Sequence, residues 1–239
     1  MVTTILLTAL VTFVLLQITN LCTTVYLHRT LAHRAITLHP AVAFLMRFWM
    51  WLFSGLNPRE WVAVHRKHHR YSDQDGDPHS PYLKGLWRIL LYNYVYYKRE
   101  CENQETVEKF GKDIPGSFLD HLPFSYKLGP MLGMVCLMAL LGWIPGLVAF
   151  WTHAVTYIAL SAAINGAAHM VGYRNFENTA TNIRTLALLT AGEGLHNNHH
   201  EYPVRAKFSF RPSEFDPAWP VIRILRAMKL ATVSTATEA

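Results

Sequence analysis

The chain has 239 residues, of which 51% are hydrophobic and only 16% are charged. About a quarter of the residues of an average soluble domain are charged, so this composition is unusually apolar. The apolar and aromatic content excludes an intrinsically disordered chain, and three cysteines are too few for a disulfide scaffold. The count of 13 histidines is high, and the candidate site is built from these side chains.

Two long stretches of the chain contain no charged residue and predict membrane-spanning helices. Neither Asp, Glu, Lys nor Arg occurs in residues 1–27 or in residues 128–173. Because the apolar core of a bilayer requires about 20 residues of helix, the first stretch predicts one span near residues 4–27. The second stretch predicts two spans, near 128–141 and 147–170, which a turn at the sequence GWIPG separates.

The positive charges predict the side of the membrane on which the rest of the chain lies. All 22 Lys and Arg fall within residues 29–127 and 174–229, and positive residues stay on the cytoplasmic side. We therefore expect a cytoplasmic cap formed by residues 28–127 and 171–230, with the N-terminus outside. No basic segment precedes the first apolar run, which argues against a cleaved signal peptide. A membrane-facing surface accounts for the net charge of +6, so no nucleic acid partner is expected.

The predicted fold class is an all-α integral membrane protein that forms one domain over residues 1–239. It should have about three transmembrane helices, an interfacial helix and a cytoplasmic helical cap that carries a di-metal site. Residues 41–56 are apolar but too short for a span, so they predict the interfacial helix. Residues 98–120 are polar and mixed in charge, which predicts a solvated helix or loop. The tail after Leu230 is expected to be frayed.

Most of the histidines occur in clusters whose spacing is typical of a metal site. The clustered residues are His28 and His33; His65, His68 and His69; Asn165 and His169; and His196, His199 and His200. Positions i, i+3 and i+4 lie on one face of a helix, so each HxxHH can direct three imidazoles the same way. His28 and His33 are five residues apart and should not share a helical face, so we expect them to flank the site from a helix end.

These clusters predict a dinuclear redox metal site under the cytoplasmic membrane surface. Nine imidazoles are too many for one ion but suit two ions of five or six coordination, and imidazole is a ligand of Zn, Cu and Fe. No cysteine or carboxylate lies inside a cluster, so the positive charge of the metals should remain uncompensated. Two alternatives stay open, because His169 could cap a helix and Asn165 could bond a neighbouring helix.

Isolated histidines and aromatic groups have simpler interpretations. His39, His121 and His153 are expected to be surface residues or hydrogen-bonded core residues. The tyrosine-rich segment 92–97 is interpreted as an interfacial anchor rather than as part of a substrate site.

Four segments of the chain resemble the integral-membrane acyl desaturases of the Δ9, stearoyl-type family. They read HRTLAH, EWVAVHRKHHRYSDQDGDPHSP, NGAAHMVGYRNF and GEGLHNNHH, and the resemblance extends over residues 20–230. It implies a non-haem di-iron enzyme that uses O2 and two electrons to introduce a cis double bond, at Δ9, into a saturated acyl chain. It also implies that the nine clustered histidines ligate two iron ions and that Asn165 reaches one of them through water. His79 matches a family position that is not a ligand.

The resemblance also implies partners and a location. The electron donor should be a separate protein of the ferredoxin or cytochrome b5 type with its reductase, because no such domain is fused to the chain. The HNNHH form of the third cluster is similar to bacterial members, so we expect an integral protein of a bacterial inner membrane with its site facing the cytoplasm. Family members usually have four spans, and this chain should begin at the second. The first span would then be dispensable, supplied by another chain, or lost through a misplaced start.

The carrier of the acyl chain is expected to differ from that of animal enzymes. Animal acyl-CoA desaturases have an Arg-Asp pair before the second cluster that contacts CoA, whereas Ala63 and Val64 stand at these positions here. The substrate could be linked to CoA, to a lipid or to a carrier protein, and we favour the last two. Nearby basic side chains could bind a phosphate in each case; they are Arg59, Arg66, Lys67, Arg70 and Lys84.

Two other classes of function are compatible with histidine clusters. A fatty acid or alkane hydroxylase would use the same di-iron scaffold, although the flanking residues favour desaturation. A non-enzymatic membrane metal or haem protein is the third alternative. A metal transporter should have ionisable residues deep within its spans, and a haem carrier needs two facing axial histidines rather than contiguous triads.

Overall fold

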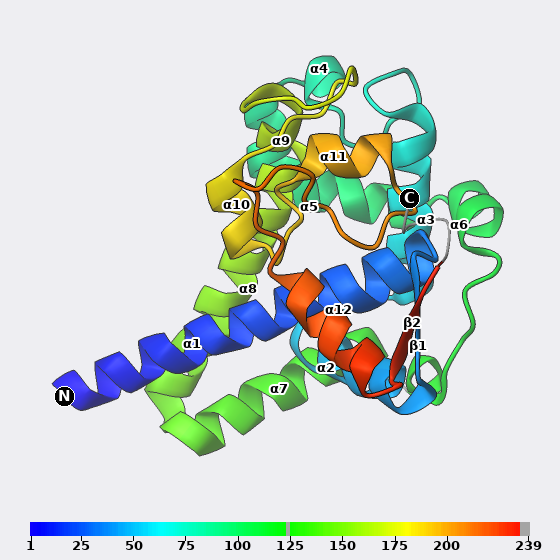
Figure 1. Ribbon diagram of the computed structural model, residues 1–239. Coiled ribbons are helices and arrows are strands. Elements are labelled where there is room, and N and C mark those ends of the chain that lie inside the picture. The colour runs from blue at the N-terminus through cyan, green and yellow to red at the C-terminus, as the bar shows by residue number, and fades with distance from the viewer. Residues whose placement is uncertain (123–124, 235–239) are drawn as a thin grey trace.

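The computed structural model describes residues 1–122 and 125–234, and this part of the chain is mostly helical (Figure 1). The helices α1, α7 and α8 extend toward the lower left of Figure 1, away from a cap in which α3, α9 and α11 lie. The predicted histidine site therefore lies in the cap, at one end of the long apolar helices.

The first long helix continues without a break from the apolar N-terminal segment into the cap. Helix α1 (Val2–Cys22) is followed directly by the π-helix η1 (Thr23–Ala32). In η1 the backbone hydrogen bonds close wider turns, and the amide of His33 donates to the carbonyl of His28 at 3.0 Å. Wide turns of this kind are rare and occur frequently at functional sites.

Helices α7 (Ser125–Leu141) and α8 (Trp143–Asn165) form a hairpin around a single residue, Gly142. Gly142 has φ of 92°, a left-handed conformation that glycine adopts without steric cost. The turn is therefore shorter than the GWIPG turn that the sequence predicts. The proline of that motif instead lies in the first turn of α8, where its missing N–H has no helical partner to lose.

Two helical segments of the described chain, rather than the predicted three, are long and apolar enough to cross a membrane. They are residues Val2–Ala32 and Trp143–Met170, the latter including the short helix α9 (Ala167–Met170). These segments contain the spans predicted near 4–27 and 147–170, and they indicate membrane association. The span predicted near 128–141 forms α7, whose 17 residues cover only about 26 Å. This length is at the lower limit for a helix that crosses a bilayer, so the third span stays a prediction.

Helix α2 (Pro40–Phe53) confirms the helix predicted over residues 41–56. Its one arginine, Arg47, is buried and donates to the carboxylate of Asp120 and to the hydroxyl of Ser117 at 2.5 and 2.7 Å. The carboxylate compensates a charge that would otherwise be costly to bury.

The cap is built from short helices joined by loops. They are α3 (Pro58–Tyr71), α4 (Pro81–Lys84), α5 (Leu86–Cys101), α6 (Gln104–Gly111), η2 (Phe118–His121), α10 (Arg184–Leu189), α11 (His196–Glu201) and α12 (Ala218–Ala227). Helix α3 begins at Pro58, and the Asn57 side chain before it accepts hydrogen bonds from the amides of Arg59 and Glu60. Residues 98–120, predicted to be a solvated helix or loop, contain the end of α5 and all of α6.

A small antiparallel sheet corrects two predictions. Strand β1 (Ile36–Leu38) pairs with strand β2 (Ala231–Val233), with Thr37 opposite Thr232. The described tail after Leu230 is thus paired rather than frayed, while residues 235–239 lie outside the described chain. Apart from this two-stranded sheet, the predicted all-α class is correct. The pairing covers the buried side chain of Ile36, which belongs to the main hydrophobic core.

Candidate metal centre

The nine clustered histidines converge on one buried region in two adjoining groups. Within each group, the potential ligand atoms lie within 4.8 Å of one another. The five-histidine group consists of His28, His33, His65, His69 and His199. The four-histidine group consists of His68, His169, His196 and His200. These residues come from η1 and its C-terminal cap, α3, α9 and α11.

In the five-histidine group, the Nε2 atoms face one another. Those of His28 and His199 lie 3.0 Å apart, and those of His199 and His69 lie 2.9 Å apart. Burial, reinforced by the neighbouring histidines, holds the pKa values of His69 and His199 well below the usual range of imidazole. The neutral imidazole is the form that binds a metal.

The π-helix explains how His28 and His33 both join this group. The prediction that residues five apart do not share a helical face assumed α-helical turns and is wrong here. The wider turns of η1 bring the ring centroids of His28 and His33 to 4.9 Å. The Nε2 atom of His33 then lies 2.8 Å from that of His65 in α3.

The four-histidine group shows the same convergence of Nε2 atoms. The Nε2 of His196 lies 3.1 Å from those of both His169 and His200, and the Nε2 of His200 lies 3.3 Å from that of His68. Each HxxHH motif divides its histidines between the two groups. The residues at i and i+4 enter one group and the residue at i+3 enters the other, so α3 and α11 each contribute to both.

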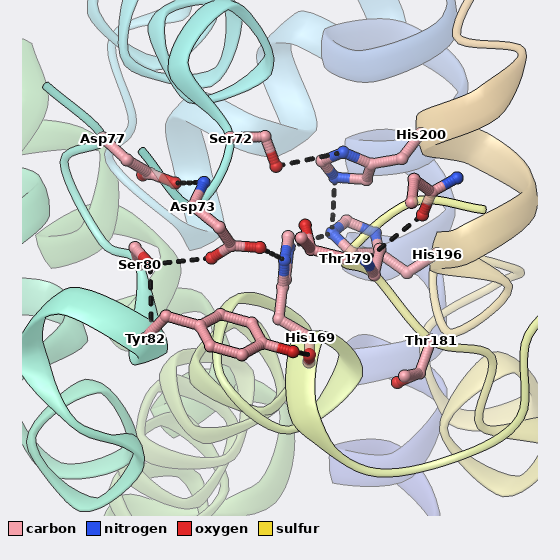
Figure 2. Close-up of polar contacts among 12 residues, drawn as sticks. Ser72, Asp73, Asp77, Ser80, Tyr82, His169, Thr179, Thr181, His196 and His200 are labelled. Atoms are coloured by element: carbon pink, nitrogen blue, oxygen red, sulfur yellow. Dashed lines mark hydrogen bonds and ion pairs between the residues drawn. The ribbon is translucent and has the colours of Figure 1, made fainter. Parts of the chain in front are cut away.

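Three buried carboxylates each accept a hydrogen bond from the outer nitrogen of one histidine. The Nδ1–H of His169 donates to Asp73 at 2.7 Å, as Figure 2 shows. The Nδ1–H of His68 donates to Asp77 at 3.0 Å, and that of His28 donates to Glu193 at 2.6 Å. A carboxylate in this position fixes the tautomer and directs the Nε2 lone pair toward the metal. The prediction of an uncompensated positive charge is therefore wrong.

The loop after α3 is folded around two of these carboxylates. The Asp73 amide donates to Asp77 at 2.8 Å, and the Ser80 hydroxyl donates to Asp73 at 2.7 Å (Figure 2). Asp73 adopts φ of 58°, a strained backbone for a residue with a side chain. Burial alone would raise the pKa of Asp77, but hydrogen bonds from His68 and from the His79 amide outweigh it and leave the pKa below the usual range.

Glu193 and a buried ion pair connect η1 to the C-terminal part of the cap. The hydroxyl of Thr24 in η1 donates to Glu193. The guanidinium of Arg29, also in η1, makes two hydrogen bonds to Asp216 at 2.8 and 2.9 Å. Both partners of this pair are buried. The C-terminal segment thereby fixes the helix that carries His28.

Comparison with known proteins identifies the family. The family model that matches is that of fatty acid desaturases, and it covers residues 4–233. The chain belongs to the fatty acid desaturase family. Its members are oxidoreductases that act on fatty acyl substrates, which agrees with the resemblance found in the sequence.

Relatives within the desaturase family differ in the position of the double bond and in the carrier that their names state. The chain is 31% identical over 229 residues to the Delta-9 desaturase-like 2 protein of Arabidopsis thaliana, covering 92% of this chain and 74% of the relative. It is 32% identical over 219 residues to the acyl-CoA C20 Delta5-desaturase of Anemone leveillei, covering 88% and 68%. It is 31% identical over 220 residues to the chloroplastic palmitoyl-monogalactosyldiacylglycerol delta-7 desaturase of Arabidopsis thaliana, covering 87% and 57%.

Asn165 lies at the edge of the histidine site, outside both histidine groups. It ends α8 and lines a cavity together with His28, His65 and His196. Its side-chain amide donates to the Asn93 side chain of α5 at 3.0 Å. The sequence left open whether Asn165 bonds a neighbouring helix, and the structure shows this bond. Asn165 also lies beside the histidines.

The other histidines of the desaturase lie outside the two groups. His39 caps α2 and is exposed, as is His121. His153 is buried in α8 and bonds the Thr19 hydroxyl at 3.0 Å. His79 is buried with its ring centroid 4.6 Å from that of His68, and its ring nitrogens have no hydrogen-bond partner among residues 1–122 and 125–234. With Asp77 and His68 it forms a third group of possible ligand atoms.

Several side chains at the histidine site were not predicted from the sequence. The three carboxylates are Asp73, Asp77 and Glu193, and they lie in the segments SDQDGDPHSP and GEG next to the histidine clusters. Their position beside these clusters was the signal that could have identified them. Trp61 stacks on His65 with a centroid distance of 5.0 Å. Tyr94 and Tyr97, interpreted as interfacial anchors, line cavities beside the site together with Asn165.

Proposed function

We propose that this protein is a non-haem di-iron acyl desaturase that introduces a cis double bond, at Δ9, into a saturated long-chain acyl group. The observation that carries the proposal is the pair of adjoining, buried, all-imidazole groups beside a cavity. Imidazole is a good ligand for iron, and the inward-facing Nε2 atoms of neutral rings fit a cation.

The five-histidine group would hold one iron ion and the four-histidine group the other, and Asn165 would reach one of them through water. When bound, the two ions would supply the activation of O2, which would take two electrons from a donor, two protons from solvent and two hydrogens from the acyl chain and be reduced to two molecules of water. The chain's own residues prepare this site. Asp73, Asp77 and Glu193 retain the Nδ1 protons of their histidines, so the Nε2 lone pairs stay directed inward.

The cavity at the histidines supports the assignment of an acyl substrate. It is lined by the apolar faces of Trp61, Val64 and Ile164 and also reaches the histidines His28 and His65. A saturated chain in this cavity would lie beside the proposed ions and away from water. Burial of about 0.8 kcal/mol per methylene would supply most of its binding free energy.

The partners and location follow from the same proposal. We propose a single desaturase domain over residues 1–239, held in a bacterial inner membrane with the site facing the cytoplasm. The distribution of Lys and Arg supports this orientation. Electrons would come from a separate ferredoxin or cytochrome b5 type donor with its reductase. All three relatives are named as desaturases, which favours desaturation over hydroxylation.

Fatty acid analysis of an expressing host tests the function directly. Gas chromatography–mass spectrometry should show a new cis double bond at carbon 9 with the wild type and none with His199→Ala. The purified protein should contain two iron ions per chain. A hydroxylated product, or an active protein with one metal ion, would contradict the proposal.

A further inference from the structure

A second cavity lies between the apolar helices and the cap. We call it the lateral cavity. It has a volume of about 520 Å³ and is bounded by α5, α7, α8 and the loop before α3. Its lining is Ser54, Gly55, Leu56, Asn57, Glu60, Tyr94, Tyr97, Lys98, Tyr126, Lys127, Pro130, Met131, Met134, Phe150 and Trp151.

The lateral cavity connects to the histidine site through shared walls. It shares Leu56, Tyr94 and Tyr97 with a smaller intermediate cavity. That intermediate cavity in turn shares Tyr97 and Asn165 with the cavity at the histidines. The three cavities thus adjoin one another in a row that ends at the histidines, and Tyr97 lines all three.

The mouth of the lateral cavity opens on an apolar surface. Its rim residues Tyr94, Met131 and Trp151 have exposed fractions of 51%, 59% and 58%. Exposed apolar side chains continue along α5 from the mouth, including Trp87 and Leu91. Exposed apolar surface of this kind marks an interaction site, and in a chain that associates with a membrane it suits contact with lipid at the mouth of the cavity.

The cavity also has a positively charged end. Lys98 lies in the last turn of α5, and Lys127 lies near the start of α7. Neither forms an ion pair with a carboxylate of the described chain. The single carboxylate in the lining, Glu60, accepts from Asn57 at 3.4 Å, and its charge is close enough to that of Lys98 to interact with it. The lining therefore offers two ammonium groups and one carboxylate, and ammonium groups are suitable partners for a phosphate.

Building on the proposed desaturase function, we propose that the lateral cavity admits one acyl chain of a membrane glycerophospholipid, whose phosphate binds Lys98 and Lys127 at the mouth. The chain passes Tyr97 toward the histidines. The second acyl chain remains in the bilayer along the apolar wall that Met131 and Met134 form. A single-chain thioester would leave this wall without an occupant, and an uncharged glycolipid would leave the two lysines without a partner.

Photo-crosslinking tests the site without relying on catalysis. The protein is reconstituted in phosphatidylcholine vesicles that contain phosphatidylglycerol with a diazirine-bearing acyl chain. Label should map to lining residues such as Tyr94, Tyr97 or Met134. Since a hydrogen bond to a charged group is worth about a tenfold change in binding or more, Lys98→Gln/Lys127→Gln should lower labelling by about tenfold or more. Lys112→Gln, an exposed lysine outside the cavity, should label as the wild type does.

Further arms separate this proposal from the desaturase function. Met134→Trp, which fills the cavity while leaving the lysines in place, should also reduce labelling. Labelling without any desaturated product would contradict the desaturase function and leave the lipid site standing. Equal labelling by a diazirine galactolipid, or no effect of the double lysine variant, would overturn the role of phosphate. Desaturation of stearoyl-CoA with no labelling by the phospholipid would overturn the site while leaving the desaturase function intact.

Discussion

The five-histidine and four-histidine groups share α3 and α11 but are supported in different ways. The five-histidine group also uses η1, and one carboxylate, Glu193, accepts from the Nδ1–H of one of its histidines, His28. The four-histidine group also uses α9, and two carboxylates, Asp73 and Asp77, bond its histidines. The Ser72 hydroxyl lies 3.4 Å from the Nδ1 of His200 in the same group.

The difference shows that similar motifs do not produce equivalent sites. The group with fewer imidazoles has more negative charge around it, which should favour a more highly charged metal ion there. The group with more imidazoles depends on a helix that the C-terminal segment fixes. Substitutions of the residues that support one histidine group should therefore affect metal binding in that group more than in the other. Four substitutions test this expectation.

The largest effect is expected from His199→Ala. The Nε2 of His199 faces those of His28 and His69, so its loss removes a ligand from the centre of the five-histidine group. Turnover should be abolished and iron content should fall by about one ion per chain, as measured by metal analysis. His39→Ala, at an exposed helix cap, is the control and should keep wild-type activity. A fully active His199→Ala protein would refute the assignment of the group.

Asp216→Ala should destabilise the support of the five-histidine group. It leaves the buried Arg29 guanidinium without its carboxylate, and breaking a buried pair costs about 3–5 kcal/mol. Thermal unfolding should shift accordingly, and the spectroscopic signal of the five-histidine iron should change more than that of the other iron. The control is Arg223→Ala, an exposed residue of α12. Equal disturbance of both irons would show that the groups are not supported separately.

Asp73→Asn should weaken the four-histidine group selectively. Loss of the carboxylate that holds a metal-ligating histidine lowers metal affinity by about 10–100-fold. Competition with a chelator should release one iron per chain earlier, and the remaining iron should keep its wild-type Mössbauer signature. Asp75→Asn, an exposed residue of the same loop, should leave affinity unchanged. If Asp73→Asn released both ions together, the two groups would have to be treated as one site.

The smallest effect is expected from Asp113→Asn. Arg66 of α3 donates to Asp113 and to the carbonyls of Leu31 and Ala32 at the end of η1. The hydrogen bond from Arg66 holds the pKa of Asp113 below its usual range. A lowered folded-state pKa adds stability above the unfolded pKa of 3.8, and this stability is lost as pH falls through the folded pKa.

Because Asp113 is partly exposed, Asp113→Asn should cost no more than about 1 kcal/mol at neutral pH. The loss should shrink as the pH falls below 3.8, the unfolded pKa. Denaturant unfolding of the two proteins across this pH range measures the difference. A loss that grows as the pH falls would contradict the assigned sign.

Local spacing was enough to predict the nine histidines but not how they are arranged. The HxxHH motifs predict shared helical faces because i, i+3 and i+4 neighbours are set by helix geometry alone. The sequence placed His28 and His33 together beside the site, but it missed that they share a helical face, which depends on the wider turns of η1. Asp73 and Glu193 were missed because their partners, His169 and His28, are distant in the sequence. Strand β2 was missed for the same reason, since its partner β1 lies near the other end of the chain.

The uninterrupted passage from α1 into η1 has a consequence for how the gene can change. No loop separates the apolar helix α1 from His28. One inserted or deleted codon within α1 would therefore rotate the part of α1 before the change by about 100° around the helix axis relative to the histidines. It would also move that part along the axis by about 1.5 Å. A single extra residue can also be absorbed as a wide turn, which is the form that η1 already has. Insertions and deletions in related genes should therefore occur mainly in the surface loops of the cap and be rare along this helix.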